Sequence, residues 1–324
     1  MKHEQSQKNA LKLLKECGNL RPKESVLIIT DAKQDPKLYG FLFEAANRLG
    51  ANPVVCLMNQ VPPGGNLPPA IDAAAKTANV IIAPTSTSIF HSEGIRVACL
   101  PPYNARLLAL SEWQLDTLES GGIEADFGNL APKVLQVRQE ISRGRRLHLT
   151  TPGGTCIEAD IDGRDAWANT GISDKPGIKM GLPTIEVFIA PREESVNGSI
   201  CVDVSCSGGI GLIQEPIRVE VKNGLAVSVT GGKEAEKLRQ LLRDSGTGNA
   251  YQVAEIAVGL NPHCRVTGNI NEDEGKYGTC HLALGNNTGF GGVNFAPLHI
   301  DMVQWKPTLV VDGKTIFEAG ECVI

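Results

Sequence analysis

The sequence lacks the long apolar segments and the excess of basic residues that mark membrane proteins and nucleic-acid-binding proteins. No apolar run approaches the roughly 18 residues that a transmembrane helix needs, and the N-terminal stretch MKHEQSQKNALKLLKECGNL has no apolar h-region. A formal net charge of −5 and a pI near 5.8 give no electrostatic footprint for nucleic acid. We therefore expect a cytoplasmic protein whose partner is a small molecule or a peptide.

The nine cysteines lack the paired spacing of zinc-binding or redox motifs. An odd number of cysteines in a chain without a signal peptide favours reduced thiols with mostly structural roles. Cys280 is of interest because it adjoins His281.

Nucleotide-binding motifs are also absent. No G-x-G-x-x-G follows the first predicted strand, no G-x-x-x-x-G-K-[ST] occurs, and TDAKQDP at 30–36 lacks the glycines that let a backbone approach a phosphate. We therefore expect the chemistry to lie in the second half of the chain.

The first half of the chain alternates short apolar runs with stretches of helical periodicity. The segments 25–31, 52–58, 79–85 and 105–110 read as buried strands, and 36–51 reads as a helix that ends at a glycine. This alternation predicts a parallel sheet with helices on both faces, and a chain of 324 residues favours two domains.

The second half is dominated by alternating strands joined by Asp-Gly or Asn-Gly, a strong hairpin signal. The predicted hairpins are 155–167, 216–232 and 307–321, with a helix at 232–246. We predict an α/β domain over residues 1–145 and a β-rich α+β domain, carrying the chemistry, over 146–324.

Potential metal ligands recur in apolar or glycine-rich settings after residue 180. Glu186 and Glu255 are single acids in LPTIEVFIAP and YQVAEIAVGLNP, where a buried carboxylate costs several kcal/mol unless a metal or another partner compensates it. The alternative for Glu186 is an edge-strand glutamate that points to water. His281, in TCHLALG, is either a ligand or a satisfied core histidine.

His299 and Asp301 are two residues apart in NFAPLHIDMV, so on a strand both side chains would leave the same face and could converge on one ion. An ordinary strand with a polar edge is the alternative. Combined with Glu186, Glu255 and His281, they provide three carboxylates and two imidazoles. Two histidines and a carboxylate would hold one ion, whereas all five would suit two ions that share a carboxylate and activate a water, as in a metallohydrolase.

Four of these segments, GLPTIEVFIAP, VAEIAVGLNP, TCHLALG and PLHIDMV, resemble the successive metal-binding signatures of the thermophilic aminopeptidases, the aminopeptidase T or leucyl aminopeptidase-like family. The resemblance covers roughly residues 180–320 and is loose elsewhere. It implies that all five residues are metal ligands, with Glu255 bridging two zinc or cobalt ions, and that the protein is a homodimer.

One position departs from that family. The aminopeptidases carry a tyrosine seven residues after the histidine of the CHLALG motif, where this chain has Thr288. The GLNP turn, the NNTGFGG turn and the H-x-D also resemble the 2,5-dihydroxypyridine dioxygenases, mononuclear iron(II) enzymes of the same superfamily. In that branch a histidine stands at the Glu255 position and apolar residues stand at those of Glu186 and His281.

We therefore expect a metal-dependent hydrolase that cleaves an amide bond in a peptide or a small amide. Glu274 is the predicted proton shuttle, although a surface turn at NEDEGK would explain it equally, and Thr288 is predicted to orient the substrate. The alternative is a single iron(II) on His281, His299 and Asp301 that cleaves a hydroxylated pyridine-type ring with dioxygen. A binding protein that has lost its chemistry is a third possibility.

Overall fold

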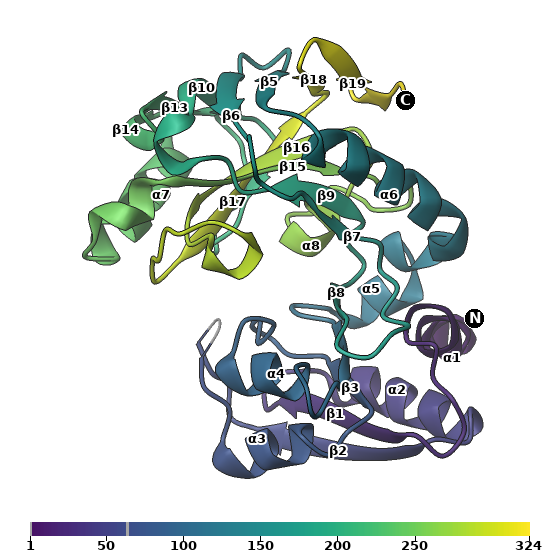
Figure 1. Ribbon diagram of the computed structural model, residues 1–324. Helices are drawn as coiled ribbons and strands as arrows, with labels where there is room; N and C mark the ends of the chain where they lie inside the picture. Colours follow the sequence, from purple (N-terminus) through teal and green to yellow (C-terminus); the bar gives the residue numbers. More distant parts are fainter. Residues whose placement is uncertain (1, 63–64) are drawn as a thin grey trace. The chain divides into compact units, whose positions relative to one another are not determined.

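The computed structural model describes residues 2–62 and 65–324 (Figure 1). It divides into two compact units, Met1–Ala131 with Asn169–Pro183, and Pro132–Ala168 with Thr184–Ile324. The boundary predicted at residue 145 lies inside the second unit, and a segment of 15 residues returns to the first. Among the described residues, no helix has the length and apolar character needed to cross a membrane.

The first unit contains a five-stranded sheet in the order β2-β1-β3-β4-β8, with all strands parallel. The strands are β1 (Ser25–Asp31), β2 (Asn52–Met58), β3 (Val80–Ala83), β4 (Arg106–Ala109) and β8 (Lys179–Gly181). The helices are α1 (Lys2–Lys12), α2 (Pro36–Arg48), α3 (Pro69–Ala75), α4 (Glu93–Ala98) and α5 (Leu115–Glu119), with a π-helix at Leu13–Cys17 and a 3₁₀ turn at Gly122–Glu124. The predicted parallel sheet is present.

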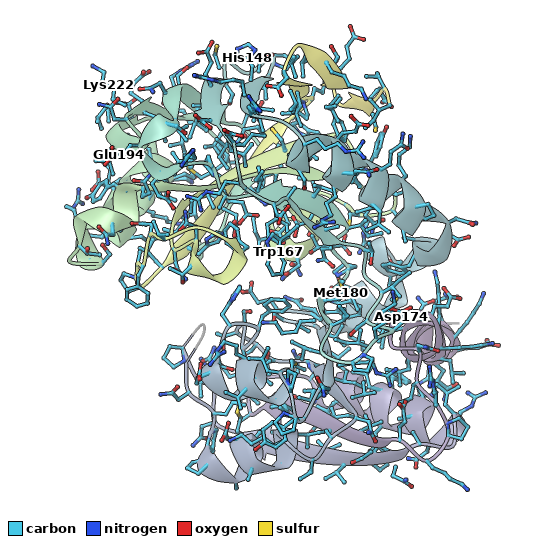
Figure 2. The ribbon with its side chains drawn as sticks, in the orientation of Figure 1. His148, Trp167, Asp174, Met180, Glu194 and Lys222 are labelled. Carbon is cyan, nitrogen blue, oxygen red and sulfur yellow. The ribbon has the colours of Figure 1, made fainter. Side chains whose placement is uncertain are left out.

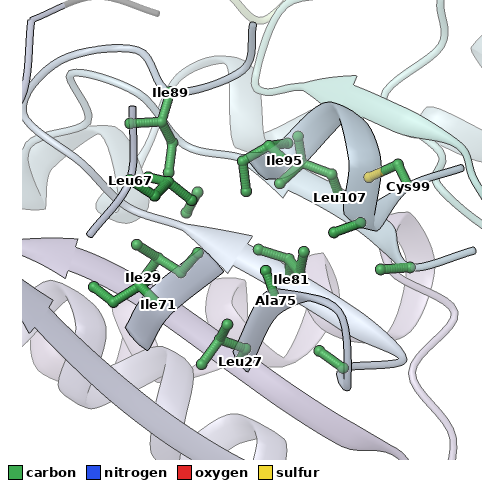
Figure 3. Close-up of a cluster of buried hydrophobic side chains, with 14 of the residues drawn as sticks. Leu27, Ile29, Leu67, Ile71, Ala75, Ile81, Ile89, Ile95, Cys99 and Leu107 are labelled. Atoms are coloured by element: carbon green, nitrogen blue, oxygen red, sulfur yellow. The ribbon is translucent and has the colours of Figure 1, made fainter. Parts of the chain in front are cut away.

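A continuous apolar core holds this sheet against its helices (Figure 3). Leu27 and Ile29 leave one face of β1, because they are two residues apart, and they join Ile81 of β3 in a cluster with Ile71 of α3 and Ile95 of α4. Burying these side chains removes apolar surface from water, which is the main driving force for forming the unit.

The second unit is built from two sheets that lie over one another in Figure 1. One has the strand order β14-β13-β10-β6-β5-β18-β19-β20 and the other has the order β12-β11-β17-β16-β15-β9-β7. The strands of the first are β5 (Arg146–Thr150), β6 (Cys156–Asp160), β10 (Asn197–Val202), β13 (Ile217–Lys222), β14 (Leu225–Thr230), β18 (Thr308–Val311), β19 (Lys314–Glu318) and β20 (Glu321–Cys322). Those of the second are β7 (Trp167–Asn169), β9 (Glu186–Ile189), β11 (Ser205–Cys206), β12 (Gly211–Leu212), β15 (Val253–Gly259), β16 (Thr279–Gly285) and β17 (His299–Trp305).

Helices and short turns complete the second unit. They are α6 (Phe127–Ser142), α7 (Lys233–Asp244) and α8 (Ile270–Asp273), with 3₁₀ turns η3 (Glu193–Ser195), η4 (Gly248–Tyr251) and η5 (Thr288–Phe290). Helix α6 begins in the first unit and ends in the second.

Two of the three predicted hairpins form, and the third does not. β13 pairs with β14 and β18 pairs with β19, each across a turn whose first residue, Asn223 or Asp312, has a φ of 48°. Asp162 lacks the positive φ that a two-residue turn of this type requires at both positions. The hairpin predicted at 155–167 is therefore wrong, because β6 pairs with β5 and β10 while β7 belongs to the other sheet.

Gly198 on β10 gives a test of this packing. Its φ is 129°, and a Cβ added there would lie 2.0 Å from the carbonyl oxygen of Cys156 on β6. We expect Gly198→Ala to lower the free energy of unfolding by about 2–5 kcal/mol, because it combines backbone strain with a clash against main chain. Gly163 also has a positive φ, of 73°, but open space around it. Urea unfolding of Gly163→Ala, with an expected loss of about 1–2 kcal/mol, is the control.

Candidate metal centre

Four neighbouring strands carry the five predicted ligands on one face of the seven-stranded sheet. β17 contributes His299 and Asp301, β16 contributes His281, β15 contributes Glu255, and β9 contributes Glu186. Because side chains alternate between the two faces of a strand, the intervening apolar residues turn to the opposite face, toward the interior of the unit. We call these five residues the ligand cluster.

Each member of the ligand cluster has a small residue opposite it on at least one neighbouring strand, and His281 also faces Val303 on β17. Across the strand pairs, Glu186 faces Gly259, Glu255 and Asp301 both face Ala283, His281 faces Ala257, and His299 faces Gly285. Directly opposed side chains are the closest neighbours on a sheet, so larger residues at these positions would fill the space that the ligand cluster occupies. The sequence thus leaves one face open for polar groups within an otherwise apolar sheet.

Glu255 lies between the two imidazoles. Its Oε1 is 3.4 Å from His281 Nε2, and its Oε2 is 3.2 Å from His299 Nε2. Asp301 Oδ1 lies 3.0 Å from the same His299 nitrogen, and Glu186 Oε2 lies 3.6 Å from His281 Nε2. The carboxylate of Glu255 thus joins the two halves of the cluster.

A backbone carbonyl sets the orientation of His299. Its Nδ1 lies 2.8 Å from the oxygen of Asn286, which can only accept a hydrogen bond. Nδ1 therefore carries the proton, and Nε2 is directed toward Glu255 and Asp301 with a lone pair available whenever the ring is neutral. This is the usual arrangement of a metal-binding histidine.

Three groups within the described residues have ligand atoms close enough to share an ion. They are Glu186 with Glu255 and His281, Glu255 with His299 and Asp301, and Glu274 with His281 and Asp301. None of these three groups contains both histidines, so the single-ion alternative on His281, His299 and Asp301 does not coincide with any of them. Glu255 takes the place that a second imidazole would have beside His299.

Burial and the charges of neighbouring residues shift the pKa values of the carboxyl groups in this cluster. Burial raises the pKa of Glu186 to about 7, against the attraction of His281. Burial also raises the pKa of Glu274 well above its ordinary value, and the charges of Glu186, Asp301 and Glu255 add to the rise. The pKa of Asp301 falls to about 2, because His299 outweighs the effect of burial.

Burial acts on the two imidazoles in the opposite sense, but their neighbours outweigh it. Burial would lower the pKa of His281, but the hydrogen bond to Glu255 and the charge of Glu186 raise it to about 8. The pKa of His299 is raised well above its ordinary value by Asp301 and Glu255, again against burial. Without a metal, therefore, protons on the imidazoles and on some carboxyl groups balance the buried negative charge.

The donor set fits a divalent metal ion. Glu186 is 8% exposed and His281 is 1% exposed. Glu186 Oε2 and His281 Nδ1 have no hydrogen-bond partner within the described part of the chain. Buried polar atoms without partners are costly, and a cation shared by these carboxylates and imidazoles would offset that cost. The structure therefore contains a possible metal-binding site made of Glu, His and Asp side chains.

The two predicted catalytic residues differ in their surroundings. Glu274 follows α8, is half-buried, and its Oε1 accepts a hydrogen bond from Thr184 Oγ1 at 3.3 Å. It faces the ligand cluster through His281 and Asp301. Thr288 is exposed, and its hydroxyl donates to Asn286 Oδ1 at 3.0 Å. Their roles in a reaction stay predictions.

Aromatic residues beside the cluster were missed from the sequence. Phe290 meets His299 edge to face with ring centroids 6.0 Å apart, and Phe188 meets Phe290 with centroids 5.3 Å apart. Trp167, labelled in Figure 2, stacks on Phe188 at 6.5 Å. Because Phe188 is two residues after Glu186, strand alternation could have placed both side chains on the same face.

An ion pair that contacts the glycine-rich turn at residues 286–294 was missed as well. Glu193 and Arg164 form an ion pair at 2.5 Å, and Glu193 Oε1 accepts a hydrogen bond from the backbone N–H of Val293 at 2.8 Å. No signal in the sequence joins residues so far apart along the chain.

The fold and the site geometry define the class of protein. It has two units, and one sheet carries a buried site of carboxylates and imidazoles. The family model described as 2,5-dihydroxypyridine 5,6-dioxygenase matches residues 7–324, so the chain belongs to that family.

Individual relatives include a dioxygenase and an aminopeptidase. The chain is 28% identical over 205 residues to the 2,5-dihydroxypyridine 5,6-dioxygenase of Pseudomonas putida, covering 59% of this chain and 58% of that protein. It is 29% identical over 196 residues to aminopeptidase T of Thermus thermophilus, covering 55% of this chain and 47% of that protein. The matched region thus spans less than two thirds of the length of either relative.

Solved structures show the same fold. The 2,5-dihydroxypyridine dioxygenase of Pseudomonas putida superposes with a TM-score of 0.85 at 21% identity and covers 100% of this chain and 98% of its own. AmpT from Thermus thermophilus superposes with a TM-score of 0.73 at 17% identity, with 99% of both chains covered.

These findings correct the expected activity. The hydrolase expectation, with its metallopeptidase and aminopeptidase character, is wrong, because the family model and its curated relative are dioxygenases. The fold is also more similar to that of the dioxygenase than to that of AmpT. The resemblance to the aminopeptidases is real at the level of sequence and fold but does not carry over to the reaction.

Cys280 tests the assignment of the sheet face. Its thiol lies 3.4 Å from Gln304 Oε1 on the face opposite the ligand cluster, and burial raises its pKa. We expect Cys280→Ser to lower the free energy of unfolding by about 1–2 kcal/mol and to leave metal content unchanged. His281→Ala is the comparison, and a loss of metal in Cys280→Ser as large as in that variant, measured by elemental analysis, would contradict the assignment.

The shifted pKa values predict how stability depends on pH. The folded-state pKa of His281 is raised from 6.5 to about 8 and that of Glu186 from 4.5 to about 7. Each contribution is complete below the unfolded-state value and is lost as pH rises through the folded-state value. The metal-free protein should therefore melt at a lower temperature at about pH 9 than at about pH 6. Glu186→Gln should flatten this decline, and a steeper or unchanged decline in that variant would contradict the assignment.

Proposed function

We propose that this protein is a metal-dependent dioxygenase that opens the ring of a hydroxylated pyridine-type substrate. The observation that carries the proposal is the ligand cluster, buried on one sheet face of a chain whose family model is that of 2,5-dihydroxypyridine 5,6-dioxygenase. A small-molecule substrate and a homodimeric assembly are part of the proposal.

The proposed metal is one iron(II), held by Glu255, His299 and Asp301. These residues form one of the three groups of converging ligand atoms, and the proton on Nδ1 leaves His299 Nε2 free to bind the ion. Oxygenases of this kind usually use two histidines and one carboxylate, whereas this group offers one histidine and two carboxylates. Bound iron(II) would supply the redox chemistry with dioxygen that the side chains themselves lack.

The remaining ligand-type residues would manage protons. Glu186, whose Oε2 lies 3.6 Å from His281 Nε2, would exchange a proton with a substrate hydroxyl. His281, whose Nε2 lies 3.4 Å from Glu255 Oε1, would hold a proton beside that carboxylate. The same residues, with Glu255, form a second converging group, so a pair of ions that share Glu255 is the alternative that metal content decides.

Aromatic side chains beside the cluster favour a flat ring as the substrate. Phe290 lies next to His299 and is 7% exposed, and the half-buried Phe188 lies next to Phe290. Offset and edge-to-face contacts between aromatic rings contribute about 0.5–1.5 kcal/mol beyond their burial. Phe188 and Phe290 would orient the substrate ring beside the metal while excluding water.

The proposal is tested by reconstitution. Metal-free protein supplied with iron(II) under anaerobic conditions should bind one equivalent and then consume dioxygen when 2,5-dihydroxypyridine is added, whereas zinc-loaded protein should not. Asp301→Asn should weaken iron binding by more than about 100-fold, because loss of a direct ligand exceeds the roughly 10–100-fold effect of an outer partner. The exposed Asp174, labelled in Figure 2, supplies the control Asp174→Asn. Oxygen consumption that persists in Asp301→Asn without bound iron would refute the proposal.

A further inference from the structure

The glycine-rich turn between β16 and β17, residues 286–294, connects the metal centre to a half-buried ion pair outside it. Two of its residues touch His299: the carbonyl oxygen of Asn286 lies 2.8 Å from Nδ1, and the ring of Phe290 meets the imidazole edge to face. The position of this turn therefore affects where His299 Nε2 points.

The turn is closed by hydrogen bonds of its own. The backbone N–H of Asn287 donates to Asn294 O at 3.0 Å, and the N–H of Asn294 donates to Asn287 Oδ1 at 2.8 Å. Asn287 is fully buried, and a Cβ added at Gly292 would lie 1.9 Å from its side chain. These bonds fix the shape of the turn but do not attach it to the rest of the unit.

One attachment is the hydrogen bond from Asn294 Nδ2 to the carbonyl oxygen of Asn249 at 2.9 Å, and the others come from Glu193 and Arg164, which we call the clamp. Glu193 Oε1 accepts from Val293 N at 2.8 Å and from Asn287 Nδ2 at 3.3 Å, while Oε2 lies 2.5 Å from Arg164 Nη2. Arg164 Nη1 in turn donates to the carbonyl oxygen of Gly291. The two side chains thus hold the turn at three points.

The clamp is partly shielded from water. The side chains of Arg164 and Glu193 are 15% and 18% exposed. Burial would raise the pKa of Glu193, but the hydrogen bond from Val293 and the charge of Arg164 outweigh it and leave the pKa below its ordinary value. Glu193 is thus an ionised carboxylate whose acceptor oxygens are occupied by the turn and by Arg164, so removing one partner leaves a charge without compensation.

We propose that the Arg164 and Glu193 clamp is a positioning device for the metal-binding imidazole. It holds the turn so that Asn286 keeps the proton on His299 Nδ1 and Phe290 limits rotation of the ring. Outer partners of metal-binding histidines act in this way, by fixing the tautomer and the ring orientation. The proposal rests on the proposed metal site but not on the reaction that occurs there.

The test measures metal binding rather than turnover. Cobalt(II) is added to the metal-free forms of the wild type, Glu193→Gln, Arg164→Met and the double variant, and the dissociation constant and the visible absorption spectrum are recorded. We expect each single variant to bind cobalt(II) about 10–100-fold more weakly with an altered spectrum. The double variant should bind no more weakly than the weaker single variant, because both changes break one link.

Matched controls come from the same segment of chain. Glu194 and Arg192 flank Glu193 and are exposed, so Glu194→Gln and Arg192→Met should leave affinity and spectrum unchanged (Glu194 is labelled in Figure 2). Arg164→Lys keeps the charge but cannot reach both partners in the same geometry, so it should recover part of the affinity lost in Arg164→Met. If Glu193→Gln does not fold, Arg164→Lys is the milder variant in which to measure cobalt(II) binding.

A purely structural role would give a different result. The clamp variants would then unfold at lower urea concentrations while the folded protein kept its cobalt(II) affinity and spectrum, and that result would overturn the proposal. A wild-type protein that binds cobalt(II) and depends on the clamp, but never consumes dioxygen with a hydroxypyridine, would instead contradict the proposed function alone. A wild-type protein that binds no cobalt(II) would overturn both.

Discussion

Burial of several carboxylates with two imidazoles on one sheet face is the constraint on which this molecule depends. Such groups are expensive to remove from water, and protons or a cation must balance their charge. The glycines and alanines opposite each ligand provide the space, and the apolar far face of the same strands provides the packing. In the metal-free protein the pKa values of Glu186 and His281 are raised, so both groups favour the protonated form and reduce the buried negative charge.

Elements with strong local patterns were predictable from the sequence. The runs at 25–31 and 52–58 are β1 and β2, and TCHLALG is β16, because continuous apolar or β-branched segments bounded by turns leave few alternatives. Features that depend on distant pairing were not predictable. β8 is only Lys179–Gly181, carries no periodicity, and joins the parallel sheet through β4, so the return of the chain to the first unit had no local signal.

The candidate ligands were predictable because each is a polar residue in an apolar run, but their grouping was not. His281 pairs with Val303, whereas His299 pairs with Gly285, four residues further along β16. That offset is about 13 Å at the usual rise of a strand, and Glu255, opposite Ala283, fills the interval. The register of the strands therefore places the carboxylate of Glu255 between the two histidines. The reaction was predicted wrongly because shared ligand motifs describe a metal site and not its chemistry.

The most direct test of a ring-cleaving dioxygenase is the origin of the oxygen in its product. Iron-loaded protein would be mixed with 2,5-dihydroxypyridine under ¹⁸O₂ in ordinary water, and the product analysed at once by mass spectrometry. We predict an open-chain product that carries both atoms of one ¹⁸O₂ molecule. An open-chain product whose new oxygen comes only from water, or an unchanged substrate beside fully iron-loaded protein, would contradict it.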